Sequence, residues 1–328
     1  MDEDWSSWLA EDAGVGHGGG RRGGKSEHKT AKPGRGSVIR LRPELAAEAG
    51  MPDRGLAETP PDDSGRPAGR TVESGQRSVL VVGGCGGAGT TTTVLGLAGE
   101  LGMTGERVLA VDATPAGGDL ALRGADTRLH PISLQSWLYG RGDGEAAPVD
   151  ECMSRASSGM GLLWRDAAPL RGRASYRTVA RALTAQGYRA IYDGGSPIAA
   201  RQLRPLLDDV DIALVLSIPA RADAANRLRV TLEWLDDEFG DAETTPDDDD
   251  PHGGIVGDTT IVISHQQPGS NSEIAQHLRE NLADWVRDIV EIPYDPHLAR
   301  GELVRSVDMA ESTRAAYLRL LDEVGVAA

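Results

Sequence analysis

SVLVVGGCGGAGTTTT, residues 78–93, is the stretch that decides the expected fold. A continuous apolar run at 78–82 is followed by a glycine-rich turn and then by threonines that begin a helix near Thr91. Glycines let backbone N–H groups converge on an anion, and the start of a helix adds the positive end of its dipole. The stretch therefore predicts a strand, a phosphate-binding loop and a helix in succession.

The loop follows the pattern G-x-x-x-x-G-K-[ST] from Gly84 to Gly89 but departs from it at the lysine. Thr90 occupies the lysine position, Thr91 occupies the position of the magnesium-binding hydroxyl, and no lysine follows Lys32. An ammonium about 4 Å from a phosphate contributes on the order of 4 kcal/mol at an effective dielectric near 20, so its loss should weaken binding. The predicted nucleotide-binding residues are Gly84, Cys85, Gly86, Gly87, Ala88, Gly89, Thr90, Thr91 and Thr92.

The rest of the chain after residue 76 alternates apolar strand patterns with helical ones. Continuous β-branched runs separated by helices predict an α/β fold with a doubly wound, mostly parallel sheet flanked by helices. The expected strands are 78–82, 107–111, 190–192, 212–218, 259–264 and 288–292. The expected helices are 91–101, 176–186, 223–238, 273–283 and 311–324.

Composition divides the chain into two parts. Residues 1–76 are rich in Gly, Pro and charge and lack an apolar pattern, which predicts a disordered tail. Residues 77–328 are expected to form one domain, interrupted by an exposed acidic loop at about 236–254 that contains four consecutive aspartates.

Charge and cysteine content narrow the function classes. Most of the net charge of −16 falls on residues 77–328, which carry 23 basic and 37 acidic side chains. Such an acidic domain argues against a nucleic-acid surface, which needs a basic patch. Cys85 and Cys152 are too few for a disulfide framework, and the sequence shows neither a signal peptide nor a membrane-spanning run. A cytoplasmic protein without membrane insertion is expected.

The loop also resembles a known family. Residues 85–92, CGGAGTTT, resemble the deviant Walker A loop K-G-G-x-G-K-T-T of the ParA/MinD P-loop ATPases, with Cys85 and Thr90 in place of its two lysines. The segment 108–115, VLAVDATP, resembles the family's V-L-x-x-D-x-D-P. Asp112 matches its first aspartate, while Thr114 occupies the position of the second, which the family uses to place the attacking water.

Two later segments extend the resemblance over most of residues 77–328. Residues 190–193 resemble the Walker B strand ending at Asp193, and 292–296 resemble a late I-P-x-D segment. The resemblance implies ATP or ADP with magnesium as cofactor, bound weakly or not at all, with Thr91, Asp112 and Asp193 addressing the metal. The resemblance identifies no catalytic residue in this chain, since Thr114 occupies the position of the family's aspartate. Hydrolysis is therefore expected to be very slow or absent.

The resemblance also implies a role. Relatives with degenerate loops act in septum placement, pilus assembly and type VII secretion of GC-rich bacteria, which suggests a scaffold or regulator in cell division, chromosome positioning or secretion-system assembly. A homodimer is implied, or a heterodimer with an active relative whose lysine completes the site. Trp5, Trp8 and Leu9 at i, i+3, i+4 spacing suggest that the tail docks a protein partner.

Two alternatives stay open at this point. The loop also satisfies G-x-G-x-x-G from Gly84 to Gly89, and Asp112 follows at the distance of a ribose-binding acid, which would suit an NAD-dependent oxidoreductase. The other alternative is an adaptor that binds no nucleotide and keeps the loop for its shape.

Overall fold

The computed structural model describes residues 77–326 apart from 141–145, 173, 241–253 and 270–272. The predicted tail, the tryptophans within it and most of the acidic loop lie outside the described residues. The strands are β1 (Ser78–Gly83), β2 (Val108–Asp112), β3 (Ser154–Arg155), β4 (Gly161–Leu163), β5 (Arg189–Gly195), β6 (Ile212–Pro219), β7 (Thr260–Ser264) and β8 (Asp288–Ile292). The helices are α1 (Thr90–Met103), α2 (Leu120–Gly124), α3 (Leu134–Tyr139), α4 (Tyr176–Ala185), α5 (Arg204–Leu207), α6 (Ala222–Phe239), α7 (Gly254–Gly257), α8 (Glu273–Leu282), α9 (Pro296–Ala299) and α10 (Glu311–Glu323). Short 3₁₀ turns cover Val149–Glu151, Arg201–Leu203 and Ser306–Asp308.

The described strands form one eight-stranded sheet in the order β3-β4-β2-β5-β1-β6-β7-β8. Every pairing is parallel except the edge pair β3–β4, which confirms the predicted fold class. β5 lies between β1 and β2. In the dinucleotide-binding fold the first two strands are neighbours, so this strand order does not support the oxidoreductase alternative.

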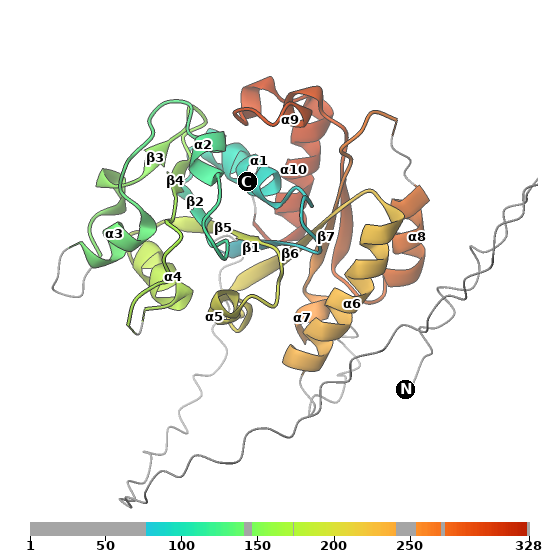
Figure 1. The fold of residues 1–328 in the computed structure, drawn as a ribbon. Coiled ribbons are helices and arrows are strands. Elements are labelled where there is room, and N and C mark those ends of the chain that lie inside the picture. Colours follow the sequence, from blue (N-terminus) through green and yellow to red (C-terminus); the bar gives the residue numbers. More distant parts are fainter. Residues whose placement is uncertain (1–76, 141–145, 173, 241–253, 270–272, 327–328) are drawn as a thin grey trace, which may run out of the picture. The chain divides into compact units, whose positions relative to one another are not determined.

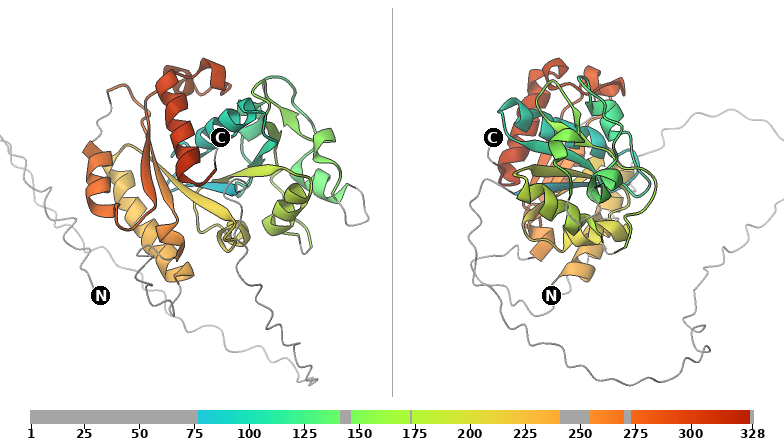
Figure 2. Two further views of the ribbon diagram at one scale, coloured as in Figure 1. Left: turned by 180° about the vertical axis from the view of Figure 1, so that it is seen from behind. Right: turned by 90° about the vertical axis from the view of Figure 1, so that its left-hand side faces the viewer.

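Helices cover both faces of the sheet (Figure 1). α1, α2 and α10 lie on one face, and α4, α5 and α6 lie on the other, as the two turned views also show (Figure 2). Because the strands are parallel, the residues that follow β1, β2 and β5 all emerge at the same edge of the sheet. This edge brings the glycine loop, Asp112 and Asp193 together.

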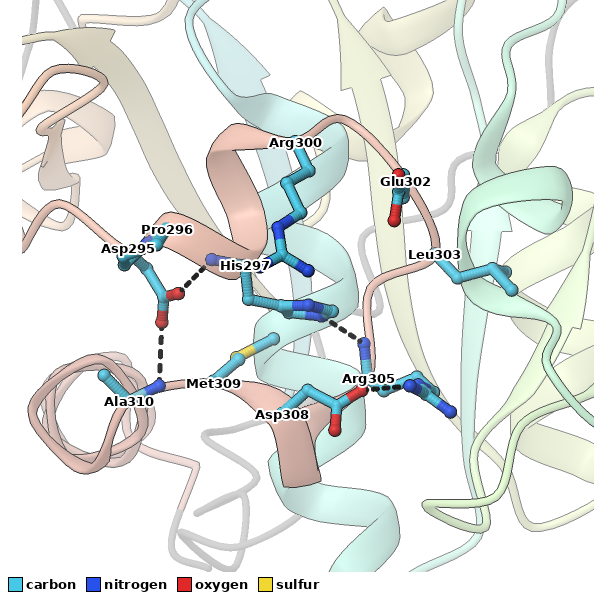
Figure 3. A pocket seen from close by; sticks show the side chains of 10 residues that line it. All are labelled: Asp295, Pro296, His297, Arg300, Glu302, Leu303, Arg305, Asp308, Met309 and Ala310. Carbon is cyan, nitrogen blue, oxygen red and sulfur yellow. Dashed lines mark hydrogen bonds and ion pairs between the residues drawn. The ribbon is translucent and has the colours of Figure 1, made fainter.

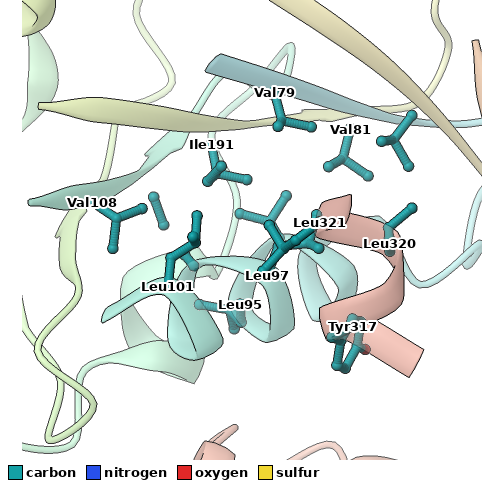
Figure 4. Close-up of a cluster of buried hydrophobic side chains, with 14 of the residues drawn as sticks. Val79, Val81, Leu95, Leu97, Leu101, Val108, Ile191, Tyr317, Leu320 and Leu321 are labelled. Carbon is teal, nitrogen blue, oxygen red and sulfur yellow. The ribbon is translucent and has the colours of Figure 1, made fainter. Parts of the chain in front are cut away.

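The main core lies between the sheet and the pair α1 and α10 (Figure 4). α1 is buried along most of its length, including glycines at 96, 99 and 102 that let neighbouring elements approach closely. Val79, Val81 and Ile191 point from the sheet toward Leu97 of α1, and Tyr317 of α10 packs on its other side. The loop that precedes α1 is thus attached to the most deeply buried helix.

Several elements differ from the expected ones. The short strands β3 and β4 and the helices between 113 and 140 were not predicted, and each is only two to six residues long. α6 continues to Phe239, so the acidic stretch begins as helix and not as loop at 236. None of the described helices is both long enough and apolar enough to cross a membrane.

Candidate functional site

The glycine loop is held by backbone and side-chain groups of two neighbouring strands. The N–H of Gly84 donates to the carbonyl of Ser217 in β6 at 2.9 Å, and the Ser217 hydroxyl donates to the carbonyl of Ala88 at 2.8 Å. The Gln266 side chain, just after β7, donates to the carbonyl of Gly87 at 2.6 Å. These hydrogen bonds tie the loop to β6 and to the residue that follows β7, and they fix its shape.

Two glycines of the loop adopt a conformation that other residues avoid. Gly87 has a φ of 75° and Gly89 a φ of 87°, both in the left-handed region. A Cβ on Gly89 would also lie 3.2 Å from the Ser264 hydroxyl oxygen. Gly89 precedes α1, and its carbonyl accepts the first helical hydrogen bond from the N–H of Thr93. The N–H groups of the first turn have no partner within the helix and are available to an anion.

The threonine in the metal position contacts the acid of β5. The Thr91 hydroxyl donates to Asp193 Oδ2 at 2.6 Å, and the N–H of Gly195 donates to Asp193 Oδ1 at 3.1 Å. Asp193 is fully buried, and this burial raises its pKa to about 6, while the Thr91 hydrogen bond opposes the rise. Because its hydrogen points to Asp193, the Thr91 oxygen keeps lone pairs for a metal ion.

Asp112 lies beside Asp193 in the register of β2 and β5, and it organises the turn that follows β2. Its Oδ1 accepts from the hydroxyl of Thr114 at 2.6 Å and from the N–H of Thr114 at 3.0 Å. Its Oδ2 accepts from the N–H of Gly118 at 2.7 Å. Thr114 therefore binds Asp112 instead of presenting a second carboxylate.

The remaining threonines of the loop lie differently from Thr91. Thr90 is buried, and its hydroxyl oxygen is close to the preceding strand: a Cβ on Gly83 would lie 2.8 Å from it. Thr92 is half-buried in the first turn of α1. The structure thus brings Thr91, Asp112 and Asp193 to one edge, while the Thr90 side chain packs back against β1.

The sequence patterns did not predict two residues whose side chains form hydrogen bonds to the loop. Ser217 and Gln266 are far from the loop in sequence and match no motif. The signal for Ser217 was a single hydroxyl inside the apolar run at 212–218, where a buried polar group needs a partner. Gln266 offered no comparable signal.

The late segment that resembles I-P-x-D forms a separate cavity of about 840 Å³ beyond β8 (Figure 3). Asp295 accepts from the N–H of His297 at 2.8 Å and from the N–H of Ala310 at 2.9 Å. His297 in turn accepts from the N–H of Arg305 at 3.2 Å, and Arg305 pairs with Asp308. These bonds hold the loops around α9 together, so Asp295 acts here as a structural cap.

The residues at the loop fit magnesium held jointly with a nucleotide. Over the described residues, no three His, Cys, Asp or Glu side chains gather into a metal site. Magnesium commonly binds through one or two protein oxygens, water and substrate phosphates. The Thr91 hydroxyl and the Asp193 carboxylate provide this donor set, as in P-loop proteins generally.

Solved structures with the same architecture belong to ParA and MinD proteins. A ParA family ATPase from Chlorobium tepidum superposes with a TM-score of 0.52 at 15% identity, over 77% of this chain and 95% of that one. The cell-division ATPase MinD from Pyrococcus furiosus gives 0.51 at 19% identity, over 76% and 98%. The Pyrococcus horikoshii septum site-determining protein MinD, complexed with Mg-ADP, gives 0.50 at 17% identity, over 75% and 96%.

The chain has the ParA/MinD fold. No protein-family model and no curated protein matches its sequence. The likeness at this level of identity concerns the fold alone, and function depends on the site residues themselves.

A buried carboxylate with a raised pKa makes stability depend on pH. The folded protein holds the Asp193 proton more tightly than the unfolded chain, whose ordinary value is 3.8, so wild-type stability falls as pH rises from about 4 to about 6. Asp193→Asn removes this loss. The quantity to compare is the free energy of unfolding of the variant minus that of wild type. This difference should be about 3 kcal/mol more favourable to the variant at pH 7 than at pH 4.

Urea unfolding at the two pH values measures this difference. Asp237→Asn, at an exposed position near the far end of α6, is the control and should show no such pH-dependent gain, because Asp237 is not among the charges that act on Asp193. An equal effect of Asp193→Asn at both pH values would contradict a protonated Asp193 in the acidic range.

Proposed function

We propose that the protein binds a magnesium nucleotide, ATP or ADP, and works as a scaffold or regulator with weak or absent hydrolysis. The observation that carries this proposal is the Thr91–Asp193 hydrogen bond at the foot of a glycine loop that the fold holds in shape. The Mg-ADP bound to the MinD structure from P. horikoshii, which has the same fold, supports the choice of ligand.

In this proposal the chain's own groups bind and orient the nucleotide. Gly84 was among the predicted binding residues, but its N–H donates to the Ser217 carbonyl, so the backbone N–H groups of residues 85–92 would surround the phosphates. The N-terminal end of α1 would add its dipole. Thr91 would ligate magnesium directly, with Asp193 and Asp112 acting on it through water. Bound magnesium would neutralise phosphate charge.

The same residues explain why turnover should be poor. Cys85 and Thr90 place no ammonium at the loop, and Thr114 uses its hydroxyl on Asp112. A transferring phosphoryl group needs positive charge and a group that orients the attacking water. Both contributions are missing from the positions at which the ParA/MinD resemblance places them, so the nucleotide would serve as a structural ligand.

As a scaffold, the protein would act in the cytoplasm through protein partners. A homodimer, or a heterodimer with an active relative that supplies a lysine, would suit division, chromosome positioning or secretion-system assembly. An adaptor without nucleotide is the second candidate, because hydrogen bonds from the Ser217 and Gln266 side chains to loop carbonyls contribute to the shape of the loop.

A nucleotide titration coupled to a phosphate-release assay tests the proposal. We expect saturable binding of Mg-ADP or Mg-ATP in the micromolar to millimolar range and no phosphate release above the no-protein rate. Thr91→Ala should weaken binding by about tenfold in magnesium and far less in EDTA. Absence of binding with the protein folded would favour the adaptor, and steady phosphate release would contradict a degenerate site.

A further inference from the structure

The exit of β6 lies directly beside the start of the glycine loop. Gly83 and Ser217 are paired in the register of β1 and β6, and the N–H of Gly84 donates to the Ser217 carbonyl. A Cβ on Gly84 would lie only 3.0 Å from Cγ2 of Ile218. The chain that leaves β6 at Pro219 therefore runs next to Gly84 and Cys85.

Arg221 lies between the end of β6 and the start of α6 and carries a positive charge. It precedes α6, two residues after Pro219, and its side chain is 62% exposed. Its backbone N–H donates to the carbonyl of Pro219 at 2.7 Å, so the backbone at Arg221 stays close to the end of β6, beside the start of the loop. An arginine next to a loop without lysine is positioned to contact what the loop holds.

The Arg221 guanidinium is hydrogen-bonded to the carboxylate of Asp223. Nε of Arg221 donates to Asp223 Oδ1 at 2.9 Å, and Nη2 donates to Oδ2 at 2.6 Å. This two-pronged arrangement on a carboxylate is the one that arginine also makes on a phosphate. Both partners of the pair are largely exposed, so water screens it and a phosphate can compete with Asp223.

We propose that Arg221 supplies the positive charge for the terminal phosphate of a nucleotide in the glycine loop, and that Arg221 pairs with Asp223 when no phosphate is bound. The inference rests on the proposed nucleotide binding and adds a residue and a switch of partner to it. When a phosphate enters the loop, it replaces Asp223 as the hydrogen-bond partner of the Arg221 guanidinium.

The test measures the affinity of the full chain for a fluorescent Mg-ATP analogue and for Mg-ADP. Arg221→Ala should weaken binding of the triphosphate by about tenfold, the effect of losing a charge-assisted hydrogen bond at an exposed site, and should weaken the diphosphate less. Asp223→Asn should tighten binding by about threefold because the competing carboxylate charge is gone.

Arg181→Ala is the matched control, since Arg181 is an exposed arginine on α4 and is not among the charges that act on Asp223. It should change affinity by less than about twofold, which separates a local contact from a general loss of positive charge. If Arg221→Ala binds as wild type does, or if Asp223→Asn binds more weakly, the role of Arg221 is wrong while nucleotide binding stands. If wild type binds no nucleotide, both proposals fail together.

Discussion

Replacing Thr90 with lysine is expected to tighten Mg-ATP binding by on the order of a hundredfold. An ammonium about 4 Å from a phosphate oxygen contributes on the order of 4 kcal/mol at an effective dielectric near 20, and solvent screening at the loop reduces this. The substitution leaves the groups of the backbone cradle and the Thr91 hydroxyl unchanged, and it adds an ammonium on a longer side chain at the buried position of Thr90. Titration of a fluorescent ATP analogue into wild type and variant measures the gain.

Thr92→Lys is the matched control because it adds the same charge in the first turn of α1, two residues away. It should give at most a few-fold increase in affinity through general attraction. Equal gains at both positions would mean that the loop does not direct the phosphate toward residue 90. No gain at Thr90 in a folded variant would contradict the assignment of the loop as a phosphate site.

Gly96→Ala should lower the free energy of unfolding by about 3 kcal/mol, near the upper end for overpacking a core. A Cβ at this position would lie 2.4 Å from two ring atoms of Tyr317, which is almost completely buried between α10 and α1. In an ordinary helix the same change stabilises by up to about 1 kcal/mol, so the sign itself is diagnostic. Urea unfolding followed by circular dichroism measures the difference.

Gly86→Ala provides the comparison for this variant. Gly86 lies in the loop, its φ is not positive, and a Cβ there would meet no atom within 4 Å. Its free energy of unfolding should stay within about 0.5 kcal/mol of wild type. A stable Gly96→Ala variant would mean that α10 packs less tightly on α1 than the structure indicates.

The sequence predicted most of the long elements because their apolar runs are continuous. β1 and β6 are buried on both faces and have clear starts and ends, and the glycines mark where β1 gives way to α1. β3 and β4 are two and three residues long, so they carry no periodicity to detect. They form because their backbone pairs with β2 and with each other, which only the tertiary structure provides.

The candidate site was predictable where a motif fixes a residue and not where packing does. Thr91 and Asp193 are 102 residues apart, and the motifs predicted that both would lie near the carboxyl ends of the strands, where a hydrogen bond joins them in the structure. Ser217 and Gln266 reach the loop from β6 and from just after β7, and the places of these strands beside β1 follow from a strand order that no motif reveals. The contact of Thr114 with Asp112 depends on the shape of one turn.

The hydrogen bonds from Ser217 and Gln266 to the carbonyls of Ala88 and Gly87 have a consequence for the thermodynamics of recognition. They are formed when the chain folds, so the conformational entropy of the loop is lost at that stage and not when a ligand arrives. A ligand would meet a rigid cradle, and even a weak one would not be opposed by an ordering penalty. A partner protein would meet nearly the same surface before and after the ligand binds, so any signal must come from groups that change contacts, such as the Arg221 side chain.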